Sequence, residues 1–555
     1  MLMPRSARFS IAGLVVALCL LPGAALAQTD DATIQRKVDQ IFAAYDKPDS
    51  PGCALGVVRD GNFIYRRGYG EGSIELSTPL TTESVFYMGS VSKQFTAASV
   101  VLAAEQGYLS LDDDVRKWVP ELPNYGKTIT LRMMLHHTSG FRDVLGLLAL
   151  GGRNFEDIHS TPELLDLLAH QKALNYTPGD EFLYSNTNFF LMSVVIPRAT
   201  KRPLSQFADE NIFKPLGMIH TRFYDDRSVI VPGRVAAYEP RGSGGFRIDW
   251  STNFEKIGDG GLMSSVDDLL LWDRNFYDNK LGKGTLWKEM QTQGVLNNGK
   301  TIEYGLGVFV SKYRGLPIVE HGGALFGYRT ELLRFPQQKF SVITLCNLGT
   351  SGPRNLANQV AEVYLAGQFA ADANGGSAAT TAQQADPQPF VGSYRSAESH
   401  SVYTLSTADG DLVLFGQHLK AAGANRFVFP GGPEFHFESG AGNAMRVTME
   451  SEDAAPQVFE RYQAIPLAAG DAGQYAGNFE SSELEATYKI EVKDGKLLLR
   501  MNWQEPASLE PTVRDEFRGP NGETLVFRRD SKGQVTGFDV FAGRVRNISF
   551  ARAKQ

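Results

Sequence analysis

The chain has 555 residues, of which 43% are hydrophobic, 11% aromatic and 21% charged. This composition is that of an ordinary folded protein and excludes a disordered, collagen-like or polytopic membrane protein. The net charge of −7 at pH 7 disfavours nonspecific nucleic-acid binding, which requires a basic face. The length allows about three or four domains.

The first 27 residues have the pattern of an export signal. Arg5 and Arg8 precede an apolar run from Phe9 to Leu21, and the small residues of Ala25-Leu26-Ala27 form a cleavage site. The apolar run is short for a membrane span, so we expect removal of residues 1–27 rather than a retained anchor. The mature protein would then begin at Gln28 and be periplasmic or secreted, with no membrane span after processing.

Two cysteines, Cys53 and Cys346, remain in the mature chain. Each lies in a strand-like apolar segment, and two cysteines alone do not make a disulfide framework. We expect two buried thiols rather than a bridge, although the distance between them cannot be read from the sequence.

One boundary divides the chain. Residues 371–387 contain no large apolar side chain and are predicted to be a linker. Before it, in residues 28–370, strand patterns alternate with long amphipathic helical patterns. After it, the pattern is almost wholly short strands and turns.

The part after the linker repeats itself at an offset of 85 residues. Residues 390–394 recur as residues 475–479, and Asp409-Gly410 recurs as Asp494-Gly495. Alternating apolar residues and Asp-Gly turns are typical of antiparallel hairpins. We therefore predict two small antiparallel, lipocalin-like β-barrels, 388–466 and 472–555. Taken alone, they are spacers or lids without chemistry of their own.

The strongest chemical signal is Ser90-Val91-Ser92-Lys93, which opens an apolar helical pattern ending at Gly107. A serine hydroxyl becomes a good nucleophile when a neighbouring base takes its proton, and a shielded lysine has a lowered pKa that suits this task. The free N–H groups of the first helical turn can also stabilise an oxyanion. The motif alone is weak, because Ser-x-x-Lys also occurs by chance.

Two further motifs follow in the chain. Tyr184-Ser185-Asn186 presents a phenol and an amide at a turn before an apolar helical stretch, and a tyrosine near a lysine can act as a base or proton shuttle. Residues 316–324 read as a strand that ends in His321-Gly322-Gly323-Ala324, where a substrate can lie against open backbone. Each of these two motifs alone could be an ordinary turn. A serine, a lysine, a tyrosine, an amide and a glycine-ended strand in this order are together a far more specific signal of an active site.

In these motifs the sequence resembles the penicillin-recognising serine hydrolases: class C β-lactamases, low-molecular-weight penicillin-binding proteins, and related esterases and D-aminopeptidases. The resemblance covers about residues 35–365 and includes the segments 135–140 and 258–265. It implies an α+β fold, with an antiparallel sheet flanked by helices and a helical subdomain. It also implies roles for the site residues, in which Ser90 is acylated, Lys93 and Tyr184 move protons, Asn186 contacts the substrate or Lys93, and the oxyanion lies near Gly323 between the N–H groups of Ser90 and Ala324.

One departure bears on the substrate. Many β-lactamases and penicillin-binding proteins carry lysine where this chain has His321, and a mostly neutral histidine offers a hydrogen bond in place of a permanent cation. The change disfavours efficient β-lactam hydrolysis and suits esterases and D-aminopeptidases. A catalytic domain followed by two barrels resembles the D-aminopeptidases, in which a loop of the last barrel reaches the active site. We expect Asp515 and Glu516 to lie on such a loop and bind a substrate amine.

Other functions find less support. Residues 294–301 match the phosphate-loop pattern literally, but no strand precedes them and no helix follows, so Asn298-Gly299 is interpreted as a hairpin turn. The nine histidines form no H-E-x-x-H motif and no Cys/His cluster, so we expect neither a metal nor another cofactor. The sequence thus predicts an exported serine hydrolase acting on D-residue peptides. The alternatives are an esterase, a DD-peptidase, a weak β-lactamase, or a non-catalytic penicillin-recognising sensor or scaffold.

The expected partner is a small peptide or ester substrate, without nucleic acid. The oligomeric state stays open, a homodimer included.

Overall fold

The computed structural model describes residues 31–154, 157–249, 255–370, 386–429, 432–440, 444–451, 454–468, 470–501 and 505–554. The predicted export signal lies outside these residues, as does nearly all of the predicted linker. Within the described ranges, no helix combines the length and apolar character that a membrane crossing requires.

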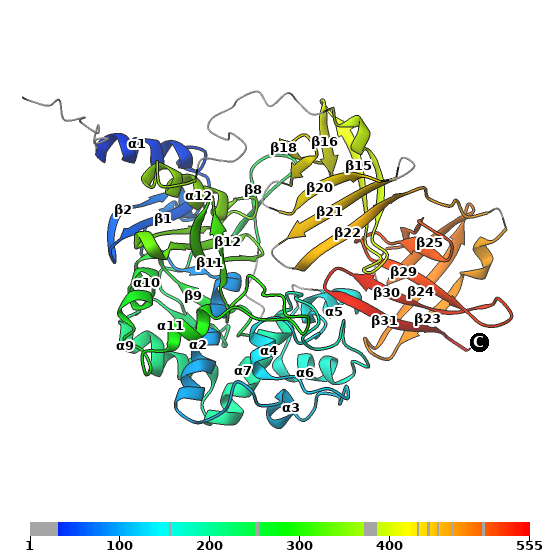
Figure 1. The fold of residues 1–555 in the computed structure, drawn as a ribbon, viewed down its shortest axis with the longest axis horizontal. Coiled ribbons are helices and arrows are strands. Elements are labelled where there is room, and N and C mark those ends of the chain that lie inside the picture. Colours follow the sequence, from blue (N-terminus) through cyan, green and yellow to red (C-terminus); the bar gives the residue numbers. More distant parts are fainter. Residues whose placement is uncertain are drawn as a thin grey trace, which may run out of the picture.

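A six-stranded antiparallel sheet forms the centre of the N-terminal part (Figure 1). Its strands, in spatial order, are β10 (Phe309–Tyr313), β11 (Leu316–Leu325), β12 (Tyr328–Phe335), β13 (Phe340–Cys346), β1 (Cys53–Arg59) and β2 (Asn62–Tyr69). The predicted glycine-ended strand is β11, and the meander that follows it is β12 and β13. β1, the first strand of the chain, thus pairs with β13, which is the last strand of this sheet in chain order.

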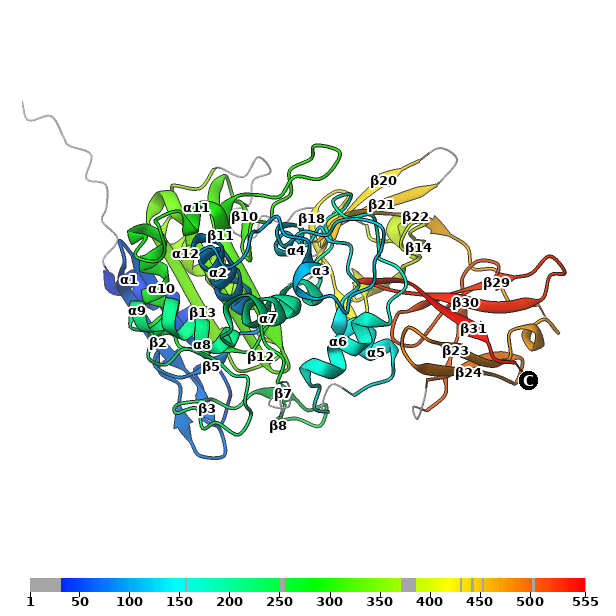
Figure 2. The ribbon, with the colours of Figure 1, turned by 90° about the horizontal axis from the view of Figure 1, so that it is seen from below.

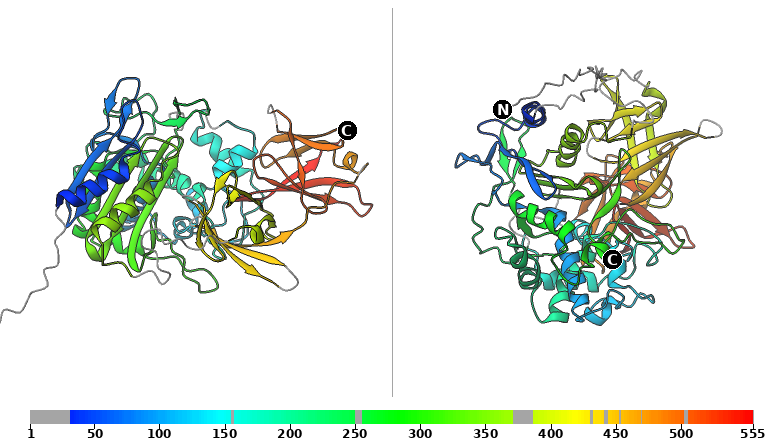
Figure 3. Two further views of the ribbon diagram at one scale, coloured as in Figure 1. Left: turned by 90° about the horizontal axis from the view of Figure 1, so that it is seen from above. Right: turned by 60° about the vertical axis from the view of Figure 1, so that its left-hand side comes forward.

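Helices cover both faces of this sheet, which explains why β1 is buried except at Arg59 and β13 is buried throughout. On one face, α1 (Asp31–Phe42) and α12 (Pro353–Tyr364) pack on side chains such as Leu55 and Leu333. On the other face, α2 (Ser92–Glu105) and α10 (Val266–Asp278) pack on Ala54 and Ile343. Figure 3 shows α1 lying along the sheet, away from the C-terminal barrels.

The remaining helices form a lobe beside the sheet and short connections. The helices are α3 (Val115–Trp118), α4 (Leu131–Leu135), α5 (Val144–Leu150), α6 (Thr161–Ala169), α7 (Asn186–Thr200), α8 (Leu204–Ala208), α9 (Lys214–Leu216) and α11 (Leu286–Gln291), with the short turns η1 (Gly89–Val91), η2 (Asp209–Phe213), η3 (Pro336–Gln338), η4 (Gln388–Phe390) and η6 (Ala472–Gln474). The small strands are β3 (Glu71–Ser73), β4 (Thr78–Pro79), β5 (Phe86–Tyr87), β6 (Arg222–Phe223), β7 (Tyr238–Pro240), β8 (Phe246–Ile248) and β9 (Leu262–Ser264).

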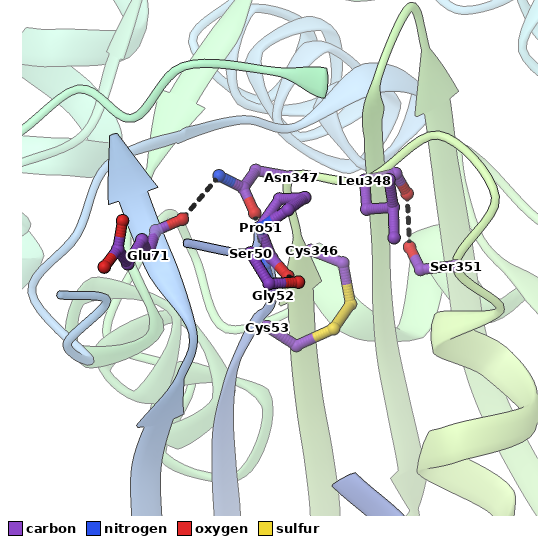
Figure 4. Close-up of a disulfide and its surroundings, with 9 residues drawn as sticks. All are labelled: Ser50, Pro51, Gly52, Cys53, Glu71, Cys346, Asn347, Leu348 and Ser351. Carbon is purple, nitrogen blue, oxygen red and sulfur yellow. Dashed lines mark hydrogen bonds between the residues drawn. A yellow bond between two sulfur atoms is a disulfide. The ribbon is translucent and has the colours of Figure 1, made fainter. Parts of the chain in front are cut away.

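The prediction of two free thiols is wrong. Cys53 and Cys346 lie directly opposite each other on β1 and β13 and form a disulfide (Figure 4). Beside the bridge, the Asn347 side chain accepts a hydrogen bond from the Gly52 N–H at 2.8 Å and donates to the Glu71 carbonyl at 3.0 Å. The error arose because the pairing of strands 293 residues apart is set by the sheet and leaves no local signal in the sequence.

Two nearly closed antiparallel sheets of nine strands follow, which confirms the predicted barrels. Barrel 1 contains β14 (Gly392–Arg395), β15 (Val402–Ala408), β16 (Asp411–Leu414), β17 (Gln417–His418), β18 (Lys420–Gly423), β19 (Arg426–Val428), β20 (Glu434–Ser439), β21 (Met445–Ser451) and β22 (Ala454–Tyr462). Barrel 2 contains β23 (Gly477–Ser481), β24 (Ala486–Lys493), β25 (Lys496–Met501), β26 (Ala507–Ser508), β27 (Glu510–Pro511), β28 (Glu516–Arg518), β29 (Thr524–Arg529), β30 (Val535–Ala542) and β31 (Val545–Arg552).

The internal repeat corresponds to a repeated topology. In each barrel the first strand pairs with the second and with the ninth, and the strand order is otherwise the same. The two Asp-Gly turns also match, with φ of 52° and 85° at Asp409 and Gly410 and of 53° and 75° at Asp494 and Gly495. Positive φ at both central residues is the requirement of the tight hairpin turn for which Asp-Gly is favoured.

Barrel 2 packs directly on the helical lobe, where α5 and α6 lie beside its strands (Figure 2). Gly146 of α5 leaves no room for a side chain, because a Cβ there would lie 2.6 Å from a methyl group of Val545. The Tyr488 hydroxyl donates to the Leu150 carbonyl at 2.7 Å. A buried ion pair joins Arg142 to Glu483 at 2.5 Å. The lobe and barrel 2 therefore share one core, whereas barrel 1 has a core of its own.

The phosphate-loop pattern is a hairpin, as interpreted. The Leu296 N–H donates to the Lys300 carbonyl at 2.9 Å, and Gly299 has φ of 84°. Residues 295 and 301 form an isolated antiparallel bridge. This geometry lacks the strand and helix that a phosphate-binding loop needs.

Candidate active site

Ser90 lies in η1, the tight turn that leads into α2. Gly89 precedes it with φ of 52°, a conformation that favours glycine. Ser90 is partly exposed, while nearly all of α2 behind it is buried. The nucleophile predicted from the sequence thus stands at the accessible end of a rigid, buried helix.

Lys93 is fully buried one turn further along and points toward Ser90. Its Nζ lies 3.1 Å from the Ser90 Oγ, and it donates to the Asn186 Oδ1 at 2.9 Å and to the Asp259 carbonyl at 2.6 Å. The segment 258–265, singled out in the sequence, supplies this carbonyl. Three contacts in different directions fix the amine beside the serine hydroxyl.

Burial lowers the pKa of Lys93 to about 7. The charge of Asp259 opposes this effect, while the positive charges of Lys256 and Arg544 add to it. An amine with this pKa is substantially neutral near pH 7, and a neutral amine can take a proton from a serine hydroxyl.

We therefore expect kcat/KM to rise with pH through a limb near pH 7, since only the neutral Lys93 accepts the proton. The measurement is kcat/KM from pH 5 to 9 with an uncharged substrate, so that only groups of the enzyme titrate. A rising limb near pH 10, the ordinary range of lysine, would show that Lys93 is not the activating base.

Tyr184 forms the next wall of the site. Its buried ring lies 4.8 Å from the Lys93 Nζ and packs on the His137 ring at 4.2 Å between centroids. His137 accepts hydrogen bonds at Nδ1 from the Ser185 N–H at 3.2 Å and from the Asn188 amide at 3.1 Å. Burial lowers the pKa of His137 well below its ordinary value, so its ring is neutral. His137 therefore orients the Tyr184 turn.

Asp143 holds Asn186 in place, and sequence reasoning missed it. Its Oδ2 accepts from the Asn186 backbone N–H at 2.6 Å and from the Asn186 side-chain amide at 2.9 Å. Its Oδ1 caps α5 by accepting from the N–H groups of Leu145 and Gly146. Because the Asn186 side-chain nitrogen donates to Asp143, the oxygen of the same amide group is turned toward Lys93. A lone Asp before an apolar run signals a helix cap, but no local pattern links it to Asn186.

The edge of β11 lies against the serine turn. A Cβ at Gly323 would lie 2.1 Å from the Met88 carbonyl and 3.0 Å from the Ser90 nitrogen, and one at Gly89 would lie 2.7 Å from the Ala324 nitrogen. Both positions thus require glycine. The backbone nitrogens of Ser90 and Ala324 therefore lie where the serine turn and β11 come into close contact, as the predicted oxyanion site requires.

His321 is buried on β11 and makes its hydrogen bonds within the protein. Its Nδ1 lies 2.6 Å from the Gly322 carbonyl and therefore carries the proton, and its Nε2 accepts from the Tyr304 hydroxyl at 3.0 Å. Burial and the Lys93 charge lower the pKa of His321 to about 3. The expectation of a neutral histidine fits this arrangement. The expected hydrogen bond to substrate does not, because both ring nitrogens already have partners.

The structure does not place Asp515 and Glu516 as expected. Asp515 binds Arg529 and the Tyr475 hydroxyl within barrel 2, and Glu516 binds Arg395 and His400 of barrel 1. Asp515 is thus bound within barrel 2 and Glu516 joins the two barrels, and these contacts do not include Ser90, Lys93 or Tyr184.

A different turn of barrel 2, residues 542–545 between β30 and β31, approaches the site instead. There the Arg544 guanidinium carbon lies 4.8 Å from the centre of the Tyr184 ring.

Among the residues that the structure describes, one group of side chains could hold a metal ion. Asp166, His170 and Glu485 have ligand atoms within 4.8 Å of one another, and all three are exposed. They belong to the end of α6 and to the β23–β24 turn, and none of them is a predicted catalytic residue.

Comparison with known proteins agrees with this fold. The Beta-lactamase family model matches residues 38–366. The chain belongs to the Beta-lactamase family. This family match contains the serine turn, the Tyr184 turn and β11, and it ends before the barrels.

Relatives extend the likeness to the barrels. The chain is 26% identical over 532 residues to a D-aminopeptidase of Gluconobacter oxydans (strain 621H), which covers 90% of this chain and 96% of the relative. It is 32% identical over 308 residues to penicillin-binding protein 4* of Bacillus subtilis (strain 168), which covers 52% of this chain and 66% of the relative.

Solved structures of other proteins share the fold of this chain. An octameric penicillin-binding protein homologue from Pyrococcus abyssi has a TM-score of 0.57 at 20% identity, over 78% of this chain and all of that one. A D-amino acid amidase from Ochrobactrum anthropi SV3 has a TM-score of 0.50 at 20% identity, over 60% of this chain and 98% of the other.

Proposed function

We propose that the protein is an exported serine hydrolase that cleaves amide bonds of D-residue-containing peptides through an acyl-enzyme. The observation that carries this proposal is the 3.1 Å contact between the Ser90 Oγ and the Nζ of a buried lysine whose pKa is lowered to about 7. A hydroxyl and an amine in this relation have the geometry of a nucleophile and its base.

In the acylation step, neutral Lys93 takes the proton of Ser90 as its Oγ attacks the substrate carbonyl carbon. The carbonyl oxygen becomes an oxyanion beside the N–H groups of Ser90 and Ala324. The proton then passes to the leaving nitrogen by way of Tyr184, the carbon–nitrogen bond breaks, and the amine departs. The product is an ester between Ser90 and the acyl group.

In the second step, a water molecule gives a proton to the same Lys93–Tyr184 pair and attacks the ester carbon. The bond to the Ser90 Oγ breaks, and the oxygen recovers its proton from Lys93. Ser90 and Lys93 return to their starting states, so the cycle consumes one water for each amide bond.

The choice of D-residue peptides rests on the relatives. D-aminopeptidases align with 90% of this chain, barrels included. A neutral, internally bonded His321 in place of a lysine disfavours β-lactams as the main substrates. Esters and acyl-D-Ala-D-Ala remain alternatives, as does a slow or inactive penicillin-recognising sensor.

Export is supported by two independent features. The first 27 residues have the pattern of a cleaved signal. The Cys53–Cys346 bridge belongs to an oxidising compartment, since cytosolic thiols are kept reduced.

A substrate panel tests the proposal. The chain from Gln28 onward is assayed with D- and L-alanyl p-nitroanilide, acyl-D-Ala-D-Ala, a short nitrophenyl ester and a chromogenic cephalosporin, beside its Ser90→Ala variant. We expect turnover of D-residue amides over their L forms, and none in the variant. Equal turnover of both enantiomers would remove the D-residue assignment, and activity retained in Ser90→Ala would remove the serine mechanism.

A further inference from the structure

Two buried carboxyl groups lie on the strands behind the active site and take no part in the proposed mechanism. Glu320 of β11 and Glu331 of β12 have relative exposures of 2% and 1%. Glu331 lies opposite Gly322, which follows Glu320 by two residues on β11. Residues two apart on a strand share a face of the sheet, as do cross-strand partners, so the two carboxyl groups lie on one face. His321 belongs to the opposite face, where its ring lies near that of Tyr184.

This pair of acids has one guanidinium beside it. Among the residues that the structure describes, Arg354 of α12 forms an ion pair with Glu320. The charge of Glu303 also acts on Glu320, and it is negative. Thr344 of β13, which lies opposite Glu331, is uncharged. Two carboxylates in one buried site repel each other strongly, so one of them keeps its proton. Burial and the charge of Glu320 raise the pKa of Glu331 well above its ordinary value.

The retained proton supplies a donor to this pair. The Glu320 Oε2 and the Glu331 Oε1 are buried and, in the described part of the chain, have no hydrogen-bond partner as long as both groups are ionised. Two carboxylates offer acceptors only, whereas a protonated Glu331 donates to Glu320. The shared proton therefore links β11 to β12 through a side-chain hydrogen bond.

This link lies directly behind the glycine segment of β11. A Cβ at Gly322 would lie 3.0 Å from the Glu331 Oε2, so the carboxyl group lies close to the β11 backbone. The adjacent residue of β12, Thr330, lies opposite Gly323 and donates to the Met88 carbonyl at 2.8 Å. Because Met88 immediately precedes the serine turn, β12 connects the buried pair to the backbone that carries the nucleophile.

We propose that Glu331 is a positioning residue, which shares one proton with Glu320 and thereby holds the glycine segment of β11 against the serine turn. Glu331 touches no reacting atom and acts through the backbone of Gly322 and Gly323. An ionised Glu331 would repel Glu320 and separate the strands beside the N–H groups that the mechanism assigns to the oxyanion. The role toward Ser90 rests on the proposed function, whereas the shared proton does not.

The pH dependence of stability tests the shared proton. The folded protein keeps a proton on Glu331 that the unfolded chain releases near about pH 4. The resulting stabilisation is complete below that pH and is lost as the pH rises toward the raised pKa of folded Glu331. We therefore expect the unfolding equilibrium constant of the wild type, relative to that of Glu331→Gln, to rise by up to about tenfold per pH unit.

The measurement is urea unfolding of both proteins from pH 5.5 to 7.5. Glu83→Gln is the matched control, because Glu83 is exposed, and its unfolding should follow that of the wild type at every pH. A ratio of unfolding constants that does not change with pH would overturn the shared proton.

The rate at which a fluorophosphonate modifies Ser90 at pH 7 tests the positioning role. Glutamine keeps a donor toward Glu320, so Glu331→Gln should react within about twofold of the wild type. Leucine fills a similar volume without a donor, so folded Glu331→Leu should react about tenfold more slowly or less. Equal rates in the two variants, whether fast or slow, would overturn the positioning role.

Glu320→Gln provides a second variant, because it removes the charge that keeps the proton on Glu331. Its stability should change less steeply with pH than that of the wild type, and an equal steepness would overturn the pairing of the two acids. If Ser90 of the folded wild type forms no adduct, the proposed function and the role toward Ser90 are both overturned. The unfolding measurements decide the shared proton in that case as well.

Discussion

Replacing Lys93 by Met should lower kcat/KM by about 10²–10⁴-fold on every substrate, the usual contribution of a positioned proton-transfer group. The reason is local, because the Lys93 Nζ lies 3.1 Å from the Ser90 Oγ and methionine offers no basic nitrogen. The fold should survive, since methionine fills a similar volume and leaves no charge in a fully buried position.

The measurement is kcat/KM on a D-residue amide, with the midpoint of thermal unfolding as the test of folding. Lys214→Met provides the matched control, because 72% of the Lys214 side chain is exposed. A properly folded Lys93→Met enzyme within about tenfold of the wild type would assign the activating base to another group.

Glu483→Ala should separate barrel 2 from the helical lobe. The Arg142–Glu483 pair has side-chain exposures of 1% and 3%, and Glu483 also accepts from the Lys172 N–H at 2.8 Å. Breaking a buried pair by removing one partner costs about 3–5 kcal/mol, because the other charge stays buried without compensation. Arg142 also donates to the carbonyls of Arg546 and Asn547 on β31, so the loss falls on the strand that follows the Arg544 turn.

Glu483→Ala should therefore unfold at a lower urea concentration than the wild type, and its kcat/KM should also change. The control is Glu460→Ala, which removes an exposed ion pair with Arg446 on barrel 1 and should cost about 0–1 kcal/mol. If the two variants unfold at the same urea concentration with the same activity, barrel 2 is not held to the lobe by this pair.

Local patterns in the sequence reveal the residues to which the proposed mechanism assigns the chemistry. Ser90 lies in the turn η1 and Lys93 in the first turn of α2 that follows it, and a spacing of three residues in such helical turns places amine and hydroxyl together. The barrels are predictable for a similar reason, because Asp-Gly turns and strand alternation are short-range features that the repeat presents twice. The backbone of β11 is predictable because its glycines allow close approach to the serine turn.

Contacts between distant segments could not be predicted in this way. Asp143 reaches Asn186, Arg544 reaches Tyr184 and Cys53 reaches Cys346 only through the packing of whole elements. The resemblance to D-aminopeptidases predicts that a loop of the last barrel reaches the site, and the turn of barrel 2 that contacts Tyr184 is the one that carries Arg544. Charged residues at a turn do not by themselves indicate a ligand site, because Asp515 binds Arg529 within barrel 2 and Glu516 binds Arg395 of barrel 1. The turn that reaches Tyr184 is marked in the sequence only by Gly543 and one arginine.

The most direct test of the acyl-enzyme mechanism is peptide mass spectrometry after treatment with a fluorophosphonate. We predict one covalent adduct on Ser90, its absence in Ser90→Ala, and its retention in Ser92→Ala, because the Ser92 hydroxyl is buried and donates to the Gly89 carbonyl at 2.6 Å. An unmodified Ser90 in folded protein, or an adduct confined to another serine, would contradict the account.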